Sequence, residues 1–353
     1  MALRIQLQKR VHGGDVWDYF PVIDFSSNVN PLGPPKSAVE AIKKELWRIG
    51  YYPDPDGKEM KAVLSRHLGL EPENITLGNG STELIKNFCE AFLRKEDEVL
   101  ILEPTFSEYG LWSEAEGAII KRVYGGKERD FEVSHKDIEF GDNTRAVFLC
   151  NPNNPTGKTI KGLDAIMKEA LERGILLFLD EAYIEFTDLE SASSKIRGYP
   201  NLFVLRSMTK FYSLPGLRIG YGVADEELIA KMEGVRVPWN VNALAQVALL
   251  KLLQDDDFAR KSREFIRMER DLLYDELSRL ELKVYCSEAN FLLFNLRHFE
   301  VTAAELRKKL IDKGILIRDC ASFHGLDEYH ARISVRSREE NFILLGELKK
   351  VLK

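Results

Sequence analysis

The chain has 353 residues, of which 44% are hydrophobic and 30% charged, so it can bury the core of about two globular domains. Its formal net charge of −6, without any basic run interrupted by aromatics, argues against a nucleic-acid-binding surface. No apolar run reaches the ~18 residues of a membrane helix, and Met1–Gly14 lacks the apolar core of a signal peptide. The four cysteines and six histidines show no disulfide or metal-ligand spacing, so we expect a cytoplasmic protein without a metal.

Residues 1–35 are the least regular part of the sequence, and they hold two short motifs. The glycines of His12-Gly13-Gly14 would let the backbone approach a ligand closely. The segment Asp24–Pro35 begins as a strand and is stopped by prolines and a glycine, and a helix is expected from about Ser37 to Ile49. The stretch Tyr51–Gly57 is a turn-rich linker.

From about residue 58 to 240 the sequence alternates between helical and strand patterns. Such alternation predicts an α/β fold with a mainly parallel, seven-stranded sheet covered on both faces. Ligands bind beyond strand ends in such sheets, and the motifs at Asn151, Asp180 and Lys210 fall at those places. A helix is expected at 160–173, and strands near Ile75, Val99, Ile119, Val147, Leu176, Val204 and Gly220.

After residue 240 the pattern changes. A long charged helical region runs to about Leu280 and is broken at Gln254–Asp257, an acidic cluster that we interpret as a solvated helix cap. Strands at 282–285, 291–295, 315–317 and 332–335, with helices at 301–313 and 338–352, predict a smaller α+β domain. We therefore expect a large domain of residues 36–240 and a small domain of residues 1–35 and 241–353, with the N-terminal segment packed on the small one.

Lys210 is the first candidate for chemistry. It follows the apolar run Leu202–Leu205, lies between hydroxyl-bearing residues and turn residues, and precedes Arg218 by eight positions. An amine in a partly desolvated pocket near another cation has a lowered pKa and can form a Schiff base with an aldehyde. A lone loop lysine would not carry this inference, but four other stretches add to it.

These stretches supply what a pyridoxal phosphate ring needs. Gly78–Thr82 opens an amphipathic helix, whose free N–H groups and two hydroxyls can hold a phosphate. The stretch Pro104–Tyr109 offers a ring to stack on a flat heterocycle, and the proline-fixed turn Asn151–Gly157 can aim an amide at a phenolic oxygen. Asp180 ends a buried strand, where a carboxylate can keep a pyridine nitrogen protonated.

In this order and spacing, the motifs resemble the fold-type I pyridoxal phosphate enzymes, aminotransferase class I and II, across nearly the whole chain. The resemblance implies that Lys210 is the Schiff-base lysine and Asp180 the partner of the pyridine nitrogen. It implies that Asn154 and Tyr183 contact the ring hydroxyl, and that Phe106 stacks on the ring, where relatives often have tyrosine. The expected catalytic residues are thus Lys210, Asp180 and Tyr183, and the expected phosphate ligands are Gly80, Ser81, Thr82, Ser207, Thr209 and Arg218.

Two further expectations follow from the resemblance. Tyr52 matches the tyrosine that reaches the cofactor phosphate of the neighbouring subunit, which implies a homodimer with shared active sites. Arg332 matches a carboxylate anchor, and Arg318 and Arg336 add sites for anions, because a planar guanidinium meets a carboxylate or phosphate with two hydrogen bonds. We therefore expect a small phosphorylated amino acid or amine as substrate.

Within the family the chain is similar to the subgroup of histidinol-phosphate aminotransferase and threonine-phosphate decarboxylase. The aminotransferase pattern usually has glycine where this chain has Arg336, and the stretches that contain His12 and Asn28 are similar to those of the decarboxylase, so all three are expected substrate ligands. This implies decarboxylation of L-threonine O-3-phosphate to (R)-1-amino-2-propanol O-2-phosphate, used for the cobalamin side chain. Transamination of histidinol phosphate with 2-oxoglutarate is the alternative. A ligand-binding regulatory domain is a remote one, since no DNA-binding region is expected before residue 12.

Overall fold

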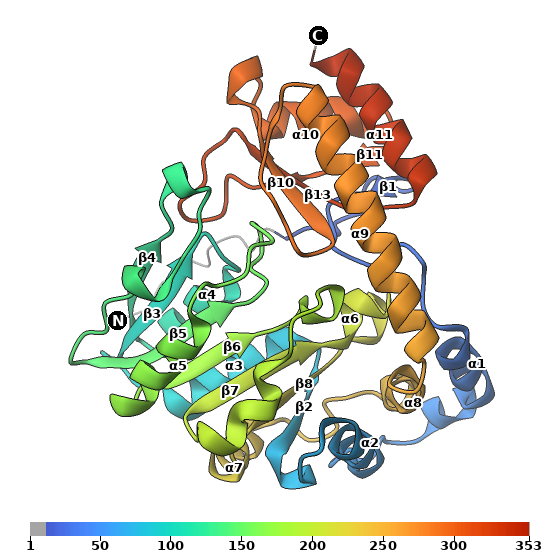
Figure 1. The fold of residues 1–353 in the computed structure, drawn as a ribbon. Coiled ribbons are helices and arrows are strands. Elements are labelled where there is room, and N and C mark those ends of the chain that lie inside the picture. The colour runs from blue at the N-terminus through green and yellow to red at the C-terminus, as the bar shows by residue number, and fades with distance from the viewer. Residues whose placement is uncertain (1–11, 353) are drawn as a thin grey trace, which may run out of the picture.

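The computed structural model describes residues 12–352, which form two groups of elements around a larger and a smaller sheet (Figure 1). Residues 1–11 and residue 353 lie outside the described residues. The expectation that Met1–Gly14 is not a signal peptide falls mostly on them. The strands are β1 (Ile23–Asp24), β2 (Ile75–Asn79), β3 (Glu98–Glu103), β4 (Ile119–Tyr124), β5 (Thr144–Cys150), β6 (Leu176–Asp180), β7 (Leu202–Ser207), β8 (Ile219–Ala224), β9 (Lys283–Val284), β10 (Phe291–Asn295), β11 (Ile315–Leu316), β12 (Arg318–Asp319) and β13 (His330–Ser334). The α-helices are α1 (Lys36–Lys44), α2 (Lys58–Leu68), α3 (Ser81–Phe92), α4 (Glu108–Ala115), α5 (Leu163–Glu172), α6 (Met208–Phe211), α7 (Glu226–Val235), α8 (Ala243–Leu252), α9 (Asp256–Arg279), α10 (Ala303–Ile311) and α11 (Arg338–Val351).

The larger sheet confirms the predicted α/β fold. Its seven strands follow the order β2-β8-β7-β6-β5-β3-β4. Only β8 runs against its neighbours β2 and β7, and the remaining pairs are parallel. Each strand that the sequence predicts between residues 58 and 240 is therefore present, in a mainly parallel sheet.

Alternating residues of the strands fill two separate cores, one on each face of this sheet. Phe148, Phe178 and Phe203 point to the face covered by α3 and α7, where they pack around Phe88. The intervening strand residues pack with α2, α5, α8 and α9 on the other face. Burial on both faces explains why these strands are continuous apolar runs in the sequence.

The smaller sheet has the order β12-β13-β10-β9 and is antiparallel. The N-terminal segment joins this part of the molecule, because β1 pairs in parallel with β11, Ile23 opposite Ile315. Helix α8 packs against α1 and α2, whereas α9 extends from there to the smaller sheet (Figure 1). The division of the chain at residue 240 stays a prediction.

Some helices begin or end at other residues than the sequence predicts. The first helix ends at Lys44 and continues as a 3₁₀ turn, Leu46–Gly50. Helix α5 starts at Leu163 because Gly162, with φ of 74°, holds the left-handed conformation at the N-cap. In the acidic cluster, the Asp255 carboxylate accepts the N–H of Phe258, so this residue caps α9.

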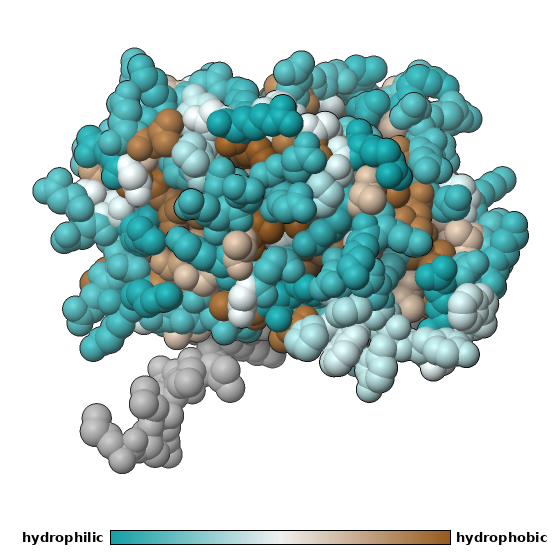
Figure 2. Space-filling view, turned by 90° about the horizontal axis from the view of Figure 1, so that it is seen from below, coloured by the Kyte–Doolittle hydropathy of each residue, from teal (hydrophilic) through white to brown (hydrophobic). Residues whose placement is uncertain are grey.

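No helix within residues 12–352 is long and apolar enough to cross a membrane. The face seen from below in Figure 1 is mainly hydrophilic, with apolar side chains in separate patches (Figure 2).

The glycine of β8 at position 222 gives a test of the packing. A Cβ on Gly222 would lie 2.1 Å from the Phe203 ring, so Gly222→Ala should lower the free energy of unfolding by about 1–3 kcal/mol through overpacking. In the control Gly234→Ala, within α7, the new Cβ meets nothing within 4 Å, so stability should stay equal or rise by up to about 1 kcal/mol. Urea unfolding curves measure both, and equal effects would contradict the described packing.

Candidate active site

A cavity of about 200 Å³ lies beyond the carboxyl ends of β5, β6 and β7. Parallel strands place these ends at one edge of the sheet, and in register Cys150 lies opposite Asp180 and Asp180 opposite Leu205. Most of the predicted site residues line this cavity: His12, Asn28, Ser81, Thr82, Phe106, Asn154, Asp180, Tyr183, Thr209, Lys210, Arg218, Arg318 and Arg332.

Lys210 lies in the short helix α6, which starts directly after β7. Burial, and then the charges of Arg218 and Arg332, lower the pKa of the Lys210 amine to about 8, although Asp24 and Asp180 oppose this shift. The direction is the one expected from the sequence. A substantial fraction of this amine is therefore neutral at mildly alkaline pH.

Asp180 is the last residue of β6 and is almost fully buried. Its Oδ2 accepts the hydroxyl of Tyr109 at 2.6 Å, and its Oδ1 accepts the N–H of Ala182 at 2.8 Å. Burial raises the pKa of the Asp180 carboxyl to about 6, while both hydrogen bonds work against that rise. The carboxylate is thus ionised above about pH 6. Tyr109, which also lines the cavity, is a residue that our sequence reasoning did not assign.

The start of α3 forms one end of the cavity, which Ser81 and Thr82 line. Gly80, with φ of 78°, precedes the helix, and no side chain caps its first N–H groups. A Cβ on Gly80 would lie 2.2 Å from Nη2 of Arg218, and one on Gly220 would lie 2.9 Å from the Ser81 nitrogen. The two glycines therefore let a guanidinium, a helix N-terminus and the hydroxyls of Ser81 and Thr82 converge, as a phosphate requires.

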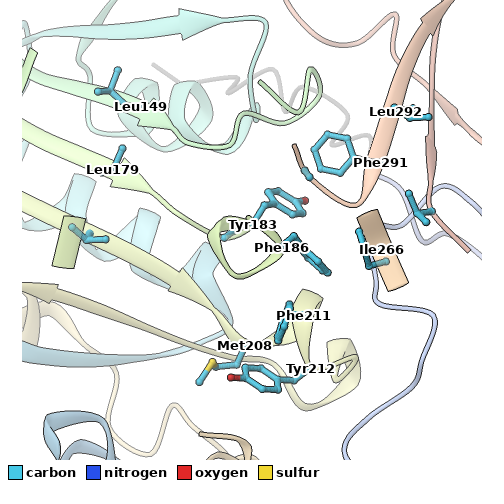
Figure 3. Packing of buried hydrophobic residues seen from close by; sticks show 14 of the residues in the cluster. Leu149, Leu179, Tyr183, Phe186, Met208, Phe211, Tyr212, Ile266, Phe291 and Leu292 are labelled. Carbon is cyan, nitrogen blue, oxygen red and sulfur yellow. The ribbon is translucent and has the colours of Figure 1, made fainter. Parts of the chain in front are cut away.

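Tyr183 and Asn154 lie between the two parts of the molecule. Nδ2 of Asn28 donates to the Tyr183 hydroxyl at 3.1 Å, and Oδ1 of Asn28 is buried without a hydrogen-bond partner. Burial raises the pKa of Tyr183 to about 12, with Arg332 and Asn28 opposing. The Tyr183 ring meets Phe291 of β10 edge-on, with centroids 5.0 Å apart (Figure 3).

The smaller sheet contributes two arginines. Arg318 of β12 lies opposite Arg332 of β13 in the antiparallel register. Arg332 donates to Oδ1 of Asn154 and, at 2.8 Å, to the carbonyl oxygen of Ser26. Burial and the nearby Arg332 lower the pKa of Arg318 to about 10. Two buried cations side by side favour a doubly anionic ligand.

His12, from the N-terminal segment, also lines the cavity. Its ring lies 5.7 Å from that of Phe106, and its Nε2 is 3.0 Å from Oε1 of Glu108.

The remaining predicted residues do not line the cavity. Ser207 is buried behind it, with its hydroxyl 3.0 Å from that of Thr209, and Gly80 lies behind Arg218. Tyr52 is 83% exposed, with its ring 5.0 Å from that of Trp239. Arg336 donates to Glu340, in the first turn of α11, at 3.0 Å. Arg336 is not among the residues that line the cavity, and its role as a substrate ligand stays a prediction.

Comparison with known proteins identifies the family. The sequence model of aminotransferase class I and II matches residues 21–348. The chain is 36% identical over 340 residues to a histidinol-phosphate aminotransferase of Moorella thermoacetica, covering 94% of this chain and 86% of that protein. It is 37% identical over 347 residues to a provisionally named threonine-phosphate decarboxylase of Caldanaerobacter subterraneus, covering 96% and 93%.

A comparison with solved structures points to the same family. The crystal structure of the histidinol-phosphate aminotransferase from Clostridium acetobutylicum is similar with a TM-score of 0.85 and 32% identity, over 93% of this chain and 98% of that chain. The cofactor that this fold family uses also fits the cavity: an uncapped helix start and Arg218 suit its phosphate, Asp180 its pyridine nitrogen, and Lys210 its aldehyde. The chain therefore belongs to the aminotransferase class I and II family and is a pyridoxal phosphate-dependent enzyme.

Proposed function

We propose that this enzyme decarboxylates L-threonine O-3-phosphate to (R)-1-amino-2-propanol O-2-phosphate, in the cytoplasm and for the cobalamin side chain. The observation that carries the proposal is the pair Arg318 and Arg332, which lines one cavity together with Lys210. A substrate with both a carboxylate and a phosphate offers one anion to each guanidinium.

The contacts of Arg332 support its assignment to the carboxylate. Its terminal nitrogens donate to neutral oxygens, those of Asn154 and Ser26, and its Nε is buried without a hydrogen-bond partner. A carboxylate would thus supply a countercharge and a bidentate partner. Arg318 and His12, at the neighbouring wall, then suit the phosphate.

When bound, pyridoxal phosphate accepts electrons from whichever substrate bond stands perpendicular to its ring. The protein selects that bond by fixing the anionic groups of the substrate. Arg332 would hold the carboxylate and Arg318 the phosphate, so in this proposal the two anchors together would present the bond between Cα and the carboxylate carbon for cleavage. Lys210 then supplies the proton that Cα takes up after carbon dioxide leaves.

Transamination of histidinol phosphate with 2-oxoglutarate is the second candidate, and one observation favours it. Arg336, the residue that distinguishes this chain from the aminotransferase pattern in sequence, pairs with Glu340 and does not line the cavity. The two arginines could bind the phosphate of one substrate and the carboxylates of the other in turn.

We also propose that the enzyme is a homodimer with shared active sites. Four large aromatic side chains near one another are strongly exposed: Trp47, Tyr51, Tyr52 and Trp239. Their rings pack in pairs, Trp47 on Tyr51 and Tyr52 on Trp239. Covering this surface with a second copy would bury these side chains, and Tyr52 would then be placed against the partner's site.

The substrate assignment is tested by replacing an anchor. With L-threonine O-3-phosphate, wild type should release carbon dioxide and aminopropanol phosphate, whereas Arg332→Lys should lose roughly ten- to a hundredfold in kcat/KM, because lysine cannot bind bidentately. The control Arg297→Lys changes an exposed guanidinium outside the cavity and should behave like wild type. Glutamate formation from histidinol phosphate and 2-oxoglutarate, without carbon dioxide from threonine phosphate, would establish the second candidate instead.

The role of Lys210 is tested by chemical trapping. Because its amine is partly neutral near pH 8, borohydride treatment of the cofactor-loaded enzyme should fix the cofactor on the peptide that contains Lys210. Lys210→Ala should still bind the cofactor reversibly but should not retain it after denaturation. Mass spectrometry locates the label, and a label on another lysine would end this assignment.

The shared site is tested with hybrid dimers. Tyr52→Phe and Lys210→Ala should each impair activity, but in a heterodimer one site carries both changes and the other carries neither. Differently tagged subunits are co-expressed, the heterodimers purified, and their turnover compared with both parents. If verified heterodimers recover no activity, Tyr52 does not act across the interface.

A further inference from the structure

The hydrogen bond between Tyr109 and Asp180 joins two elements of the site that are distant in sequence. Tyr109, in the first turn of α4, is fully buried and donates its hydroxyl proton to Oδ2 of Asp180 at 2.6 Å. The bond is short and charge-assisted, and such bonds are roughly twice as strong as neutral ones.

Packing fixes Tyr109 in this position. Its ring stacks on Phe148, with centroids 5.4 Å apart and planes 19° apart, and meets the Phe106 ring edge-on at 5.8 Å. Burial and the neighbouring Asp180 raise the pKa of the Tyr109 phenol well above its usual value. The hydroxyl therefore keeps its proton throughout the working pH range and remains a donor.

The other groups around Asp180 do not replace this donor. The N–H of Ala182 binds the opposite carboxylate oxygen, Oδ1. Lys210 favours the ionised carboxylate through its charge, and Glu185 disfavours it through its own charge. Cys150 is buried beside the pair, and burial raises the pKa of its thiol well above the usual value, so it stays neutral.

We propose that Tyr109 is a positioning residue that keeps Asp180 ionised and aimed into the cavity, and that it thereby sets the lower pH limit of cofactor binding. The inference rests on the proposed role of Asp180 toward the pyridine nitrogen. It does not depend on which substrate the enzyme uses.

The direction of the pH effect follows from the charge. Cofactor affinity requires the Asp180 carboxylate, so it is present above the pKa of this group and is lost as the pH falls through about 6. Removing a donor to the carboxylate raises that pKa. A lost hydrogen bond to a charged group should move the midpoint upward by about one to two pH units.

The experiment measures the dissociation constant of pyridoxal phosphate from the apoenzyme between pH 5 and 9. Tyr109→Phe keeps the ring packing and deletes the hydroxyl, and its affinity should fall at a midpoint about one to two units above that of wild type. The control Tyr285→Phe deletes another buried hydroxyl, one that contacts His330 outside the cavity, and should leave the midpoint unchanged. A wild-type midpoint in Tyr109→Phe would overturn the proposal.

A second pair of variants separates positioning from general structural support. In Asp180→Asn the loss of affinity that depends on the Asp180 carboxylate should disappear, and adding Tyr109→Phe should then change the affinity less than threefold at every pH. An equally large loss in both backgrounds would show that Tyr109 acts on the fold alone and would overturn the proposal. If Asp180→Asn binds the cofactor like wild type at every pH, the assignment of Asp180 itself fails, whatever the reaction.

A further variant keeps the test possible if Tyr109→Phe folds poorly. With 3-fluorotyrosine at position 109, the hydroxyl is a stronger hydrogen-bond donor, so the pH midpoint of cofactor affinity should fall below that of wild type. An unchanged midpoint would overturn the proposal.

Discussion

The parallel register of β5, β6 and β7 is the constraint on which the site depends. Side by side, these strands end at one edge, so the loop after Cys150, the carboxylate of Asp180 and the helix that carries Lys210 meet although they are far apart in sequence. Burial of alternating residues on both faces holds that register, because a slip by one residue would exchange the two cores. The reversed strand β8 adds the close approach of Arg218 to the start of α3.

Charge at this edge explains the preference for anions. Lys210, Arg218, Arg318 and Arg332 line the cavity, and Asp180 is the one carboxylate among the described residues that do so. Burial, and then the charges of the neighbouring arginines, lower the pKa of Lys210 and of Arg318, and bound anions would offset both effects. A cofactor phosphate at Arg218 and two anionic groups of a substrate would balance the cavity.

Much of the fold and site could be predicted from the sequence because both depend on local patterns. Apolar runs followed by Gly80, Asn154, Asp180 or Lys210 mark strand ends, and strand ends of a parallel sheet converge. Tyr109 escaped this reasoning because its partner lies 71 residues away and only the fold brings them together. Arg336 was assigned from its place in a motif, and the sequence pattern does not show its ion pair with Glu340, four residues on. The start of α5 differs from the predicted one because a single residue, Gly162, forms its N-cap.

Which bond of the substrate breaks is the central question, and isotopes answer it most directly. L-Threonine O-3-phosphate labelled with ¹³C in its carboxylate should be incubated with the enzyme in D₂O and followed by NMR and mass spectrometry. We predict that the label leaves as carbon dioxide and bicarbonate, and that aminopropanol phosphate gains one deuterium on the carbon that bears the amine. Retention of the label in the amino acid or in a 2-oxo acid, with deuterium exchange at Cα, would contradict the decarboxylase and show that the enzyme breaks the Cα–H bond.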